Sequence, residues 1–380
     1  MNLIEEITNN YPTDKKAALY YKTEPFFSGI NYSHTNNWEI FQSVEILNRK
    51  GFAVDLIDRS NSDWSPSKKF DLFLGLGVGN AGRNFVQHST ASKARVSVLL
   101  SMGPQPDISN ELVLKRYDIF KERTGVNAPP MRTVTEVTGE NFKKIITKAD
   151  YVFNIGQKNN NSYKSFLPYG KPVLNFYPSS SPDVKYNNSW AKSRNRNSFL
   201  CFAGNGFICK GVDLVVESFL KNPTKTLHIC GPQSETAFFN YYKKRISDSP
   251  NIKYHGFVTP GGDLFNQLAS ECSYVIFHSA AEGCCTSVAT AMRAGLVPII
   301  NPWTGIITED LVLSEENSDD DGRTIIDTIT QTVNEASKMP YDNYVSLTDK
   351  TLEQATLFSQ DSFTKSYSEA LDIVTDENNL

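Results

Sequence analysis

Cysteine and histidine are scarce in this chain of 380 residues, which has six cysteines and five histidines. The cysteines lie between Cys201 and Cys285, several of them inside apolar runs, and they form no CxxC pair. The histidines form no HxxxH or similar pair either. Free buried thiols in a reducing compartment explain this pattern better than disulfides or zinc ligands. We therefore expect neither a disulfide framework nor a metal site.

An excess of positive charge and long hydrophobic runs are also missing. Lys and Arg number 38 against 42 Asp and Glu, so the net charge is -4 and the basic character of a general nucleic-acid binder is absent. Apolar stretches such as residues 95–100 are too short to span a bilayer. The start, MNLIEEITNN, lacks the basic and apolar regions of a signal peptide. We expect a soluble, cytoplasmic protein that binds no nucleic acid.

What the sequence does contain is a regular alternation of short apolar runs with amphipathic segments of helical length. Strands are expected at residues 16–21, 52–57, 70–74, 96–100, 150–155, 172–176, 198–203, 226–230, 254–257, 274–278 and 297–300. Helices are expected at residues 38–49, 211–220, 262–271 and 287–294, with two or three more from residue 324 onward. Such alternation predicts an α/β protein built from βαβ units with mostly parallel sheets.

The alternation stops between residues 178 and 197, where turn-forming and basic residues dominate, and we place a domain boundary there. We predict Rossmann-like domains at residues 1–180 and 181–360, and a helix and tail at 361–380 that can pack back on the first domain. The acidic stretch 309–321 is expected to be a solvated loop or helix entrance. Doubly wound sheets in tandem leave a ligand-binding cleft between the carboxyl ends of their strands.

The most informative segment is FAGNGFICKG, residues 202–211, in which a strand ends, glycines open a loop and a Lys-Gly pair precedes a helix. Gly204 and Gly206 let backbone N–H groups approach an anion, and Lys210 supplies a positive charge. This segment alone fits an anion-binding loop and an ordinary strand-to-helix turn equally well.

A second segment, residues 277–292, repeats the order of strand, loop and helix, with Glu282 and Gly283 at the turn. Thr286 and Ser287 are suitable helix N-caps. Backbone donors in the first turn of that helix would face the cleft, where phosphate or sugar oxygens can bind. Glu282 is placed to bind sugar hydroxyls, although a surface acid without a function would look the same.

Taken together, the two segments resemble the C-terminal domain of GT-B glycosyltransferases, particularly the retaining family-4 group. The resemblance covers roughly residues 199–305 in the order G-x5-KG, HICGP, HGFV, EG and GLVPI. The N-terminal half is similar only in architecture. The resemblance implies a GT-B fold of two doubly wound Rossmann-like domains facing a cleft. It also implies transfer of a sugar from a nucleotide-diphosphate sugar to a glycan or lipid-linked glycan, with retention and without a bound metal or other cofactor.

The resemblance also assigns roles to residues, with Lys210, Glu282 and Asn205 as the catalytic set. Lys210 would hold the diphosphate, and Glu282, the first acid of the family's E-x7-E motif, would contact the donor sugar. Asn205 stands where an Arg is usual, and Thr290 replaces the second acid, which usually binds ribose. Because two neutral residues replace an oppositely charged pair, the net charge of the site is preserved, and we expect a divergent but active subgroup. The donor-binding set also includes Gly29, Gly204, Gly206, Gly231, Val258, Gly283, Cys284, Cys285, Thr286 and Ser287, with backbone groups around Val258 reading the base.

The N-terminal domain is expected to hold the acceptor. Residues 27–38 follow the first predicted strand and resemble the family's glycine-containing loop over the diphosphate. Gly29 would allow close backbone approach. His34, Asn37 and Trp38 suit sugar binding, because polar groups bind hydroxyls and an indole stacks on a pyranose face. Asn-rich loops are also common turn material, so each assignment stands only as an expectation.

Residues 75–82 contain GxGxxG spacing, but no clear acid ends the next strand as a dinucleotide fingerprint requires. We interpret them as a loop lining the cleft. Family members often carry a His after the following strand, where this chain has Ser-Met-Gly-Pro at residues 101–104. Arg83 and His88 are the candidates to replace it and complete the acceptor-binding set.

Three alternatives stay open at this point. One is another GT-B activity, such as an inverting transferase or a nucleotide-sugar epimerase. The second is a non-catalytic nucleotide-sugar or glycan-binding protein, suggested by Asn205 and Thr290, and the third is a nicotinamide dehydrogenase. Peripheral membrane contact is a further option, through Lys143, Lys144 and Lys148 and the run 192–196, although a solvated helix face and a polar linker explain these residues more simply. The sequence does not disclose the donor sugar, the nucleobase, the acceptor or the oligomeric state.

Overall fold

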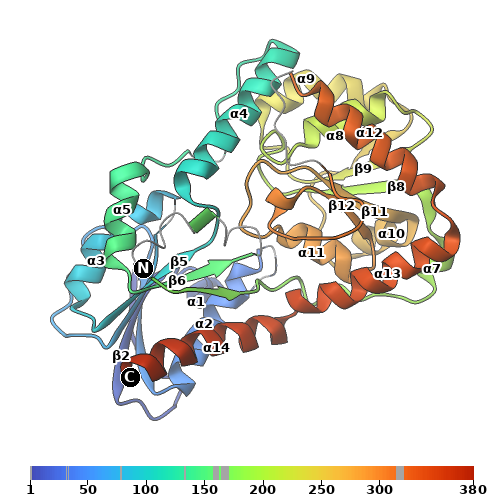
Figure 1. The fold of residues 1–380 in the computed structure, drawn as a ribbon. Helices are drawn as coiled ribbons and strands as arrows, with labels where there is room; N and C mark the ends of the chain where they lie inside the picture. Colours follow the sequence, from blue (N-terminus) through green and yellow to red (C-terminus); the bar gives the residue numbers. More distant parts are fainter. Residues whose placement is uncertain are drawn as a thin grey trace. The chain divides into compact units, whose positions relative to one another are not determined.

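The structure, a computed structural model, describes residues 2–30, 32, 34–77, 79–131, 134–156, 162–163, 171–313 and 321–380. The chain forms two compact units. Unit 1 consists of Met1–Ile108, Thr135–Ser179 and Gln360–Leu380, and unit 2 consists of Ser109–Val134 and Ser180–Ser359. Each unit contains a β-sheet with helices on both faces, as Figure 1 shows.

The sheet of unit 1 has the strand order β1-β3-β2-β4-β5-β6-β7. Its strands are β1 (Leu3–Ile7), β2 (Lys15–Tyr21), β3 (Phe52–Asp58), β4 (Leu72–Leu76), β5 (Val96–Ser101), β6 (Tyr151–Ile155) and β7 (Val173–Phe176). Neighbouring strands are parallel, apart from the edge strand β1, which is antiparallel to β3. The central strands β4, β5 and β6 are buried along their whole length, as expected for a parallel sheet covered on both faces.

The helices of unit 1 cover this sheet in two layers. They are α1 (Pro25–Ser28), α2 (Asn36–Arg49), α3 (Phe85–Ser92), α5 (Gly139–Lys148) and α14 (Gln360–Asn378), with a 3-10 turn, η1, at Gly79–Asn84. In Figure 1, α2 and α14 lie against one face, and α3 and α5 against the other. The C-terminal helix α14 packs on β7 and α2, where Phe363 and Tyr367 contact the ring of Phe176.

The sheet of unit 2 is parallel, with the strand order β10-β9-β8-β11-β12. Its strands are β8 (Asn195–Phe202), β9 (Thr226–Cys230), β10 (Ile252–Tyr254), β11 (Cys272–Phe277) and β12 (Val297–Ile300). The chain winds outward from β8 through β9 to β10, then returns to the other side of β8 as β11. The point where the winding reverses, between β8 and β11, is the usual ligand-binding place in a doubly wound sheet.

Helices cover both faces of this second sheet as well. They are α7 (Trp190–Ser193), α8 (Val212–Leu220), α9 (Thr236–Ser247), α10 (Asp263–Glu271), α11 (Thr286–Arg293), α12 (Arg323–Lys338) and α13 (Tyr341–Ala355), with 3-10 turns η3 at Pro302–Thr304 and η4 at Thr356–Phe358. Figure 1 shows α8, α9 and α12 on one face, and α7, α10, α11 and α13 on the other. Helix α4 (Pro106–Thr124) begins in unit 1 and belongs to unit 2 from Ser109 onward.

The predicted α/β class is confirmed, and most predicted elements lie within two residues of their observed ends. A strand predicted at residues 254–257 ends at Tyr254 instead, because Gly256 adopts the left-handed φ of 71° and Phe257 is exposed. The elements β1, α1, α3, α4, α5, α7 and α9 have no counterpart among the predictions. Most of the acidic stretch 309–321 lies outside the described residues.

The residue ranges of the two compact units differ in part from the three predicted ranges. The predicted boundary near residue 180 adjoins the division between Ser179 and Ser180. Residues 109–134, inside the first predicted range, group with unit 2, and the last 21 residues, Gln360–Leu380, group with unit 1. The six cysteines are free thiols, five of them buried, and Cys284 is half-buried.

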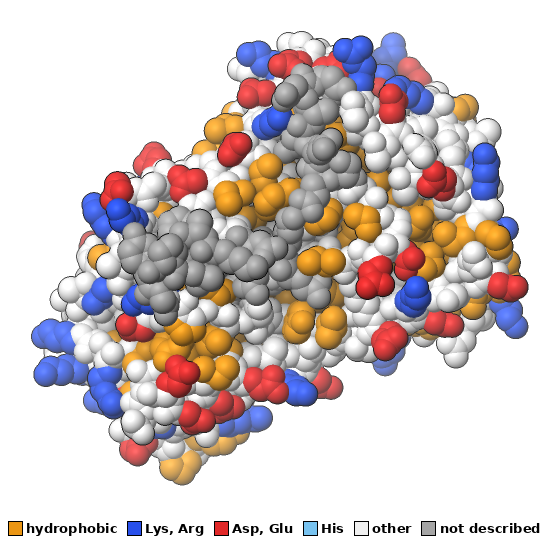
Figure 2. All heavy atoms as spheres, viewed as in Figure 1, with side chains coloured by type: hydrophobic (Ala, Val, Ile, Leu, Met, Phe, Trp, Pro, Cys, Tyr) orange, Lys and Arg blue, Asp and Glu red, His pale blue; other side chains and the backbone are white. Residues whose placement is uncertain are grey.

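The two basic stretches considered for lipid contact differ in the structure. Arg194 is buried and donates to the carbonyl oxygens of Ala269 at 2.8 Å, Gly295 at 2.5 Å and Ala294. The lysines of α5 are exposed. On the face shown in Figure 2, acidic and basic side chains are interspersed. Within the described ranges, every helix is too short or too polar to cross a bilayer.

Candidate functional site

The candidate donor site is formed by two loops at the reversal point of the unit 2 sheet. β8 and β11 are neighbouring parallel strands, so the loops that follow them leave the same edge of the sheet. The loop at residues 203–211 follows β8 and leads into α8, and the loop at residues 278–285 follows β11 and leads into α11. The two segments with the strongest sequence signal therefore start side by side.

Lys210 and Glu282, one from each loop, form an ion pair. Their side chains are only 15% and 9% exposed. The Lys210 ammonium also lies 5.6 Å from the ring centroid of Phe277, the last residue of β11. Because the pair is largely shielded from water, its charges interact more strongly than at the surface. The structure thus brings together the cation and the acid that the sequence singles out.

Backbone contacts hold the two loops against each other. The Ala280 N–H donates to the Cys209 carbonyl at 2.9 Å. Gly211 has a left-handed φ of 70° and precedes α8, and a Cβ at this position would overlap the carbonyl oxygen of His278. Gly211 is therefore required both for its conformation and for the close approach of the second loop.

The Glu282 loop rests on the segment that follows β12. The Glu282 N–H donates to the Trp303 carbonyl at 2.9 Å, and the Cys285 N–H donates to the Thr304 carbonyl at 2.8 Å. A Cβ at Gly305, whose φ is 78°, would overlap the Gly283 carbonyl. These contacts fix the backbone on either side of Glu282.

Helix α11 begins directly after this loop. Its N-cap is Cys285, and no side chain makes a capping hydrogen bond there, so the predicted capping role of Thr286 and Ser287 is wrong. The reason is the start of the helix: Thr286 is already its first residue. The Ser287 hydroxyl instead lies 3.3 Å from the Cys285 sulfur, and burial raises the pKa of the Cys285 thiol. The N–H groups of a first helical turn, together with the helix dipole, favour an anion.

The two residues that depart from the family pattern have partners of their own within unit 2. Asn205 is exposed, and its Oδ1 accepts a hydrogen bond of 2.7 Å from the Ser234 hydroxyl. Thr290 is buried in α11, and its hydroxyl oxygen accepts from the Ser181 N–H at 3.4 Å. The hydroxyl that stands in place of the family's ribose-binding acid is thus engaged with the backbone of Ser181.

The proposed base-reading segments also meet. The Gly231 N–H donates to the Gly256 carbonyl at 2.7 Å, and Val258 is buried two residues further on. Nearby, the rings of His228 and His255 are stacked, with 3.0 Å between His228 Nδ1 and His255 Nε2. Burial lowers the pKa of His228 to about 4, so the ring is neutral at physiological pH. Sequence reasoning did not predict this pair.

The acceptor-binding candidates of residues 29–38 lie in unit 1. Gly29 is exposed with a φ of 81°, and a Cβ there would meet open space. His34 is exposed, and its Nδ1 accepts from the Asn36 N–H at 3.3 Å. Asn37 is buried and accepts a 2.6 Å hydrogen bond from Lys22, and the half-buried Trp38 packs edge-on against Phe363. The predicted sugar-stacking indole is thus partly occupied by the C-terminal helix.

Arg83 and His88 occupy different environments. Arg83 is exposed and forms an ion pair of 2.7 Å with Glu136. His88 is fully buried, where its Nε2 lies 2.7 Å from the Asn61 carbonyl oxygen and its ring contacts the edges of Tyr20 and Trp64. Burial also lowers the pKa of His88. His88 is not accessible to a ligand in this structure.

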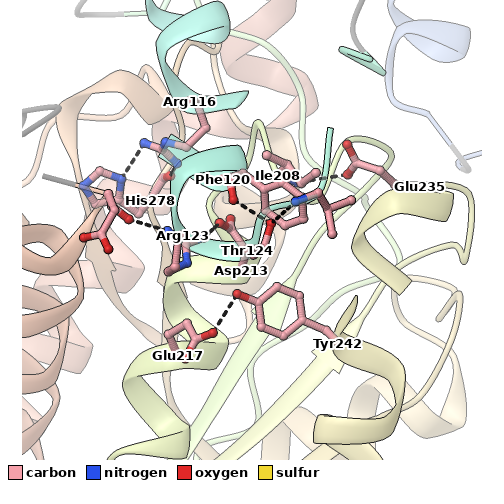
Figure 3. Close-up of polar contacts among 12 residues, drawn as sticks. Arg116, Phe120, Arg123, Thr124, Ile208, Asp213, Glu217, Glu235, Tyr242 and His278 are labelled. Carbon is pink, nitrogen blue, oxygen red and sulfur yellow. Dashed lines mark hydrogen bonds and ion pairs between the residues drawn. The ribbon is translucent and has the colours of Figure 1, made fainter. Parts of the chain in front are cut away.

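Sequence reasoning also missed the contribution of α4 to unit 2. Figure 3 shows Arg116 pointing toward His278, at the start of the Glu282 loop, and Glu235 lying beside Ile208 in the Lys210 loop. The sequence of α4 carries little amphipathic signal, because its buried face includes Arg116 and Arg123. In the described part of the chain, no three His, Cys, Asp or Glu side chains gather so as to hold a metal ion.

No protein-family model matches the sequence, and no curated protein matches it. Solved structures do match. Sucrose-phosphate synthase from Thermosynechococcus elongatus is similar with a TM-score of 0.66 and 11% identity, over 96% of this chain and 100% of that one. WaaG, a glycosyltransferase involved in lipopolysaccharide biosynthesis, has a TM-score of 0.54 and 14% identity, over 95% and 99% of the two chains.

The pneumococcal O-GlcNAc transferase GtfA, solved in complex with UDP and GlcNAc, is similar with a TM-score of 0.50 and 13% identity. The match covers 93% of this chain but 62% of GtfA, so this chain spans less than two thirds of GtfA's length. At these identities the likeness concerns the fold. Together with the two mainly parallel sheets, it shows that this chain has the GT-B fold.

Proposed function

We propose that the protein is a glycosyltransferase that moves a sugar from a nucleotide-diphosphate sugar to a glycan or lipid-linked glycan acceptor. The observation that carries the proposal is the Lys210–Glu282 pair at the reversal point of the unit 2 sheet. A cation for a diphosphate and an acid for sugar hydroxyls stand there next to the N-terminus of α11. The solved structures with this fold that are named for glycosyl transfer support the same class of reaction.

Within this proposal, Lys210 and the first-turn N–H groups of α11 bind the diphosphate and stabilise its charge as it leaves. The bond between the anomeric carbon and the diphosphate oxygen breaks through an oxocarbenium-like transition state. The acceptor hydroxyl forms the new bond on the same face of the sugar, and its proton passes to the leaving diphosphate. Glu282 orients the donor sugar. No metal or other cofactor has a role in this scheme.

Membership of the retaining family-4 group is part of the proposal, with Asn205 and Thr290 in place of the usual Arg and acid. Backbone groups near Gly231 and Val258 would then receive the base, and the exposed part of residues 29–38 in unit 1 would receive the acceptor. Inversion or epimerisation stays an alternative outcome. The anomeric configuration of the product, read by NMR, separates retention from inversion.

A second candidate function is non-catalytic binding of a nucleotide sugar or glycan. The hydrogen bond between Thr290 and the Ser181 backbone favours this candidate. Thr290 replaces the acid that usually binds ribose in the family, and its hydroxyl is already engaged within the protein. Donor binding measured by calorimetry, without formation of any product, would support this candidate over transfer.

The experiment that tests the main proposal starts with a panel of nucleotide sugars, screened by thermal shift with and without simple glycan acceptors. The donor that stabilises the protein most is then assayed for transfer. Inclusion of NAD(P)H in the panel tests the dehydrogenase alternative. Flotation with anionic vesicles tests peripheral membrane contact, with the exposed lysines of α5 as the candidate surface. If no donor is bound or turned over, the proposal is wrong.

A further inference from the structure

One face of α4 forms part of the interior of unit 2. Residues 109–134 lie between parts of unit 1 in the sequence but belong to unit 2. Arg116, Phe120 and Arg123 recur at helical spacing, and all have side chains exposed by less than a tenth. Leu114, two residues from Arg116 on the other side of the helix, is exposed. The inward face of α4 therefore carries two arginines among apolar side chains.

Arg116 contacts the start of the Glu282 loop through both terminal nitrogens of its guanidinium. Its Nη1 donates to the His278 carbonyl at 2.7 Å, and its Nη2 lies 2.9 Å from His278 Nδ1, as Figure 3 shows. Because a guanidinium only donates, Nδ1 must accept, so His278 carries its proton on Nε2. Arg116 thus fixes both the backbone and the ring orientation of the residue that follows β11.

The same helix also reaches the Lys210 loop. The Tyr117 hydroxyl donates to one oxygen of Glu235 at 2.6 Å, and the other oxygen accepts from the Ile208 N–H at 2.9 Å. Burial is the main cause of the raised pKa of Glu235. At the end of this loop, a Cβ on Gly211 would lie 2.7 Å from Arg116 Nη1. Arg116 is therefore in contact with both candidate donor loops.

A further ion pair secures α4 beside these contacts. Arg123 pairs with Asp213, a fully buried residue in the first turn of α8, and donates to the Asp321 carbonyl at 2.9 Å. Burying several charged groups is costly, and an apolar side chain would fill the same space at a smaller cost. The two donors that Arg116 directs to His278 do what an apolar side chain cannot, since together they set the position and the orientation of that residue.

We propose that Arg116 is a positioning residue, which holds the Lys210 and Glu282 loops in the relative placement that glycosyl transfer requires. This inference rests on the function proposed above. Lys210 and Glu282 must meet different parts of one donor, so a small shift between their loops separates the leaving-group contact from the sugar contact. Misplacement of a reacting group by about 1 Å can lower the rate about 100-fold.

The test compares Arg116→Lys and Arg116→Met with the wild-type chain. Lysine keeps the charge, but a single ammonium does not reproduce the planar fork, so both variants should lose about 10- to 100-fold in kcat. The donor KM should change by less than about 3-fold, since ground-state binding is less sensitive to placement than the transition state. Hydrogen exchange of the amides at residues 279–285 should become faster in both variants.

Arg245→Met is the matched control. Arg245 pairs with Glu217 of α8 in the same unit, with 3.1 Å between Nη2 and Oε2. Its guanidinium also lies over the rings of Tyr241 and Tyr242, so it contacts α8 and α9 rather than the two loops. This variant should lower stability while leaving kcat and the exchange at residues 279–285 unchanged. If Arg116→Met does not fold, Arg116→Lys alone decides.

Unchanged exchange at residues 279–285, or full kcat in a folded Arg116 variant, would overturn the positioning role. Restoration of activity by Arg116→Lys alone would also overturn it, because the charge rather than the fork would then matter. If the wild-type chain turns over no nucleotide sugar, the proposed function fails, and the exchange measurement still decides whether Arg116 holds this loop.

Discussion

Lys210 pairs with Glu282 although 72 residues separate them in the sequence. The pair neutralises the lysine in a largely buried place, so a bound diphosphate has to compete with the Glu282 carboxylate for the same ammonium. This competition makes the two residues separable by experiment. Removal of the cation and removal of the acid should have different effects on binding and on turnover.

Lys210→Ala should lower turnover by about 100-fold or more, which is typical of the loss of one group that stabilises developing negative charge. The measurement is the initial rate of transfer with the donor found in the panel. Lys221→Ala is the control, because Lys221 forms an exposed pair with Asp327 in the same unit. Near-full activity of Lys210→Ala would remove Lys210 from the mechanism.

Glu282→Gln should bind the nucleotide diphosphate more tightly, by about 3- to 10-fold, because the lysine no longer has a competing carboxylate. Turnover should fall, since the donor sugar loses its charged partner. Calorimetry at two salt concentrations and the transfer assay provide the two readouts. Glu217→Gln removes one acid from another ion pair of unit 2 and should change neither. Weaker nucleotide binding by Glu282→Gln would contradict the competition.

Much of the fold could be predicted from the sequence because apolar runs mark the buried parallel strands. The helix α4 could not, since Arg116 and Arg123 occupy positions that an amphipathic pattern assigns to apolar residues. The strand predicted at residues 254–257 instead covers Ile252–Tyr254, because hydrophobicity again does not match burial there. Its apolar end, Phe257, follows the left-handed Gly256 and faces solvent.

The closeness of Lys210 and Glu282 could be predicted, because the two residues follow strands that are neighbours in a doubly wound sheet. Their roles toward a donor stay predictions. Contacts such as Tyr117–Glu235 and His228–His255 join residues with no local signal of their own. Only the packed fold brings them together.

Gly211→Ala should destabilise unit 2 far more than Gly206→Ala. Both glycines have left-handed φ values, 70° and 84°, so each alanine meets a conformational cost of about 1–2 kcal/mol. A Cβ at Gly211 would also overlap the His278 carbonyl, whereas at Gly206 the nearest atom would be 3.9 Å away. Urea unfolding should show a loss above about 3 kcal/mol for Gly211→Ala. Equal losses would mean that the two loops are not in close contact.

Glu39 gives a prediction about the pH dependence of stability. It is buried in α2 and accepts hydrogen bonds from the Ser179 N–H at 2.7 Å and hydroxyl at 3.0 Å. Burial raises the pKa of Glu39 from 4.5 to about 7, and the hydrogen bonds from Ser179 offset part of that rise. The folded state therefore holds this proton more tightly than the unfolded state does. The contribution is fully present below pH 4.5 and is lost as pH rises through about 7.

Glu39→Gln keeps an acceptor for Ser179 and cannot ionise, so its stability relative to wild type should increase between pH 4.5 and 7, by up to about 3 kcal/mol. Urea unfolding across this range provides the measurement. Glu45→Gln is the control on the same helix. Hydrogen bonding from Tyr11, with smaller contributions from Asn9 and Arg49, lowers the pKa of Glu45 below 4.5, so the relative stability of that variant should decrease only as pH rises toward 4.5 and should stay nearly constant between pH 4.5 and 7. Parallel curves for wild type and Glu39→Gln would show that Glu39 is ionised in the folded protein throughout the range.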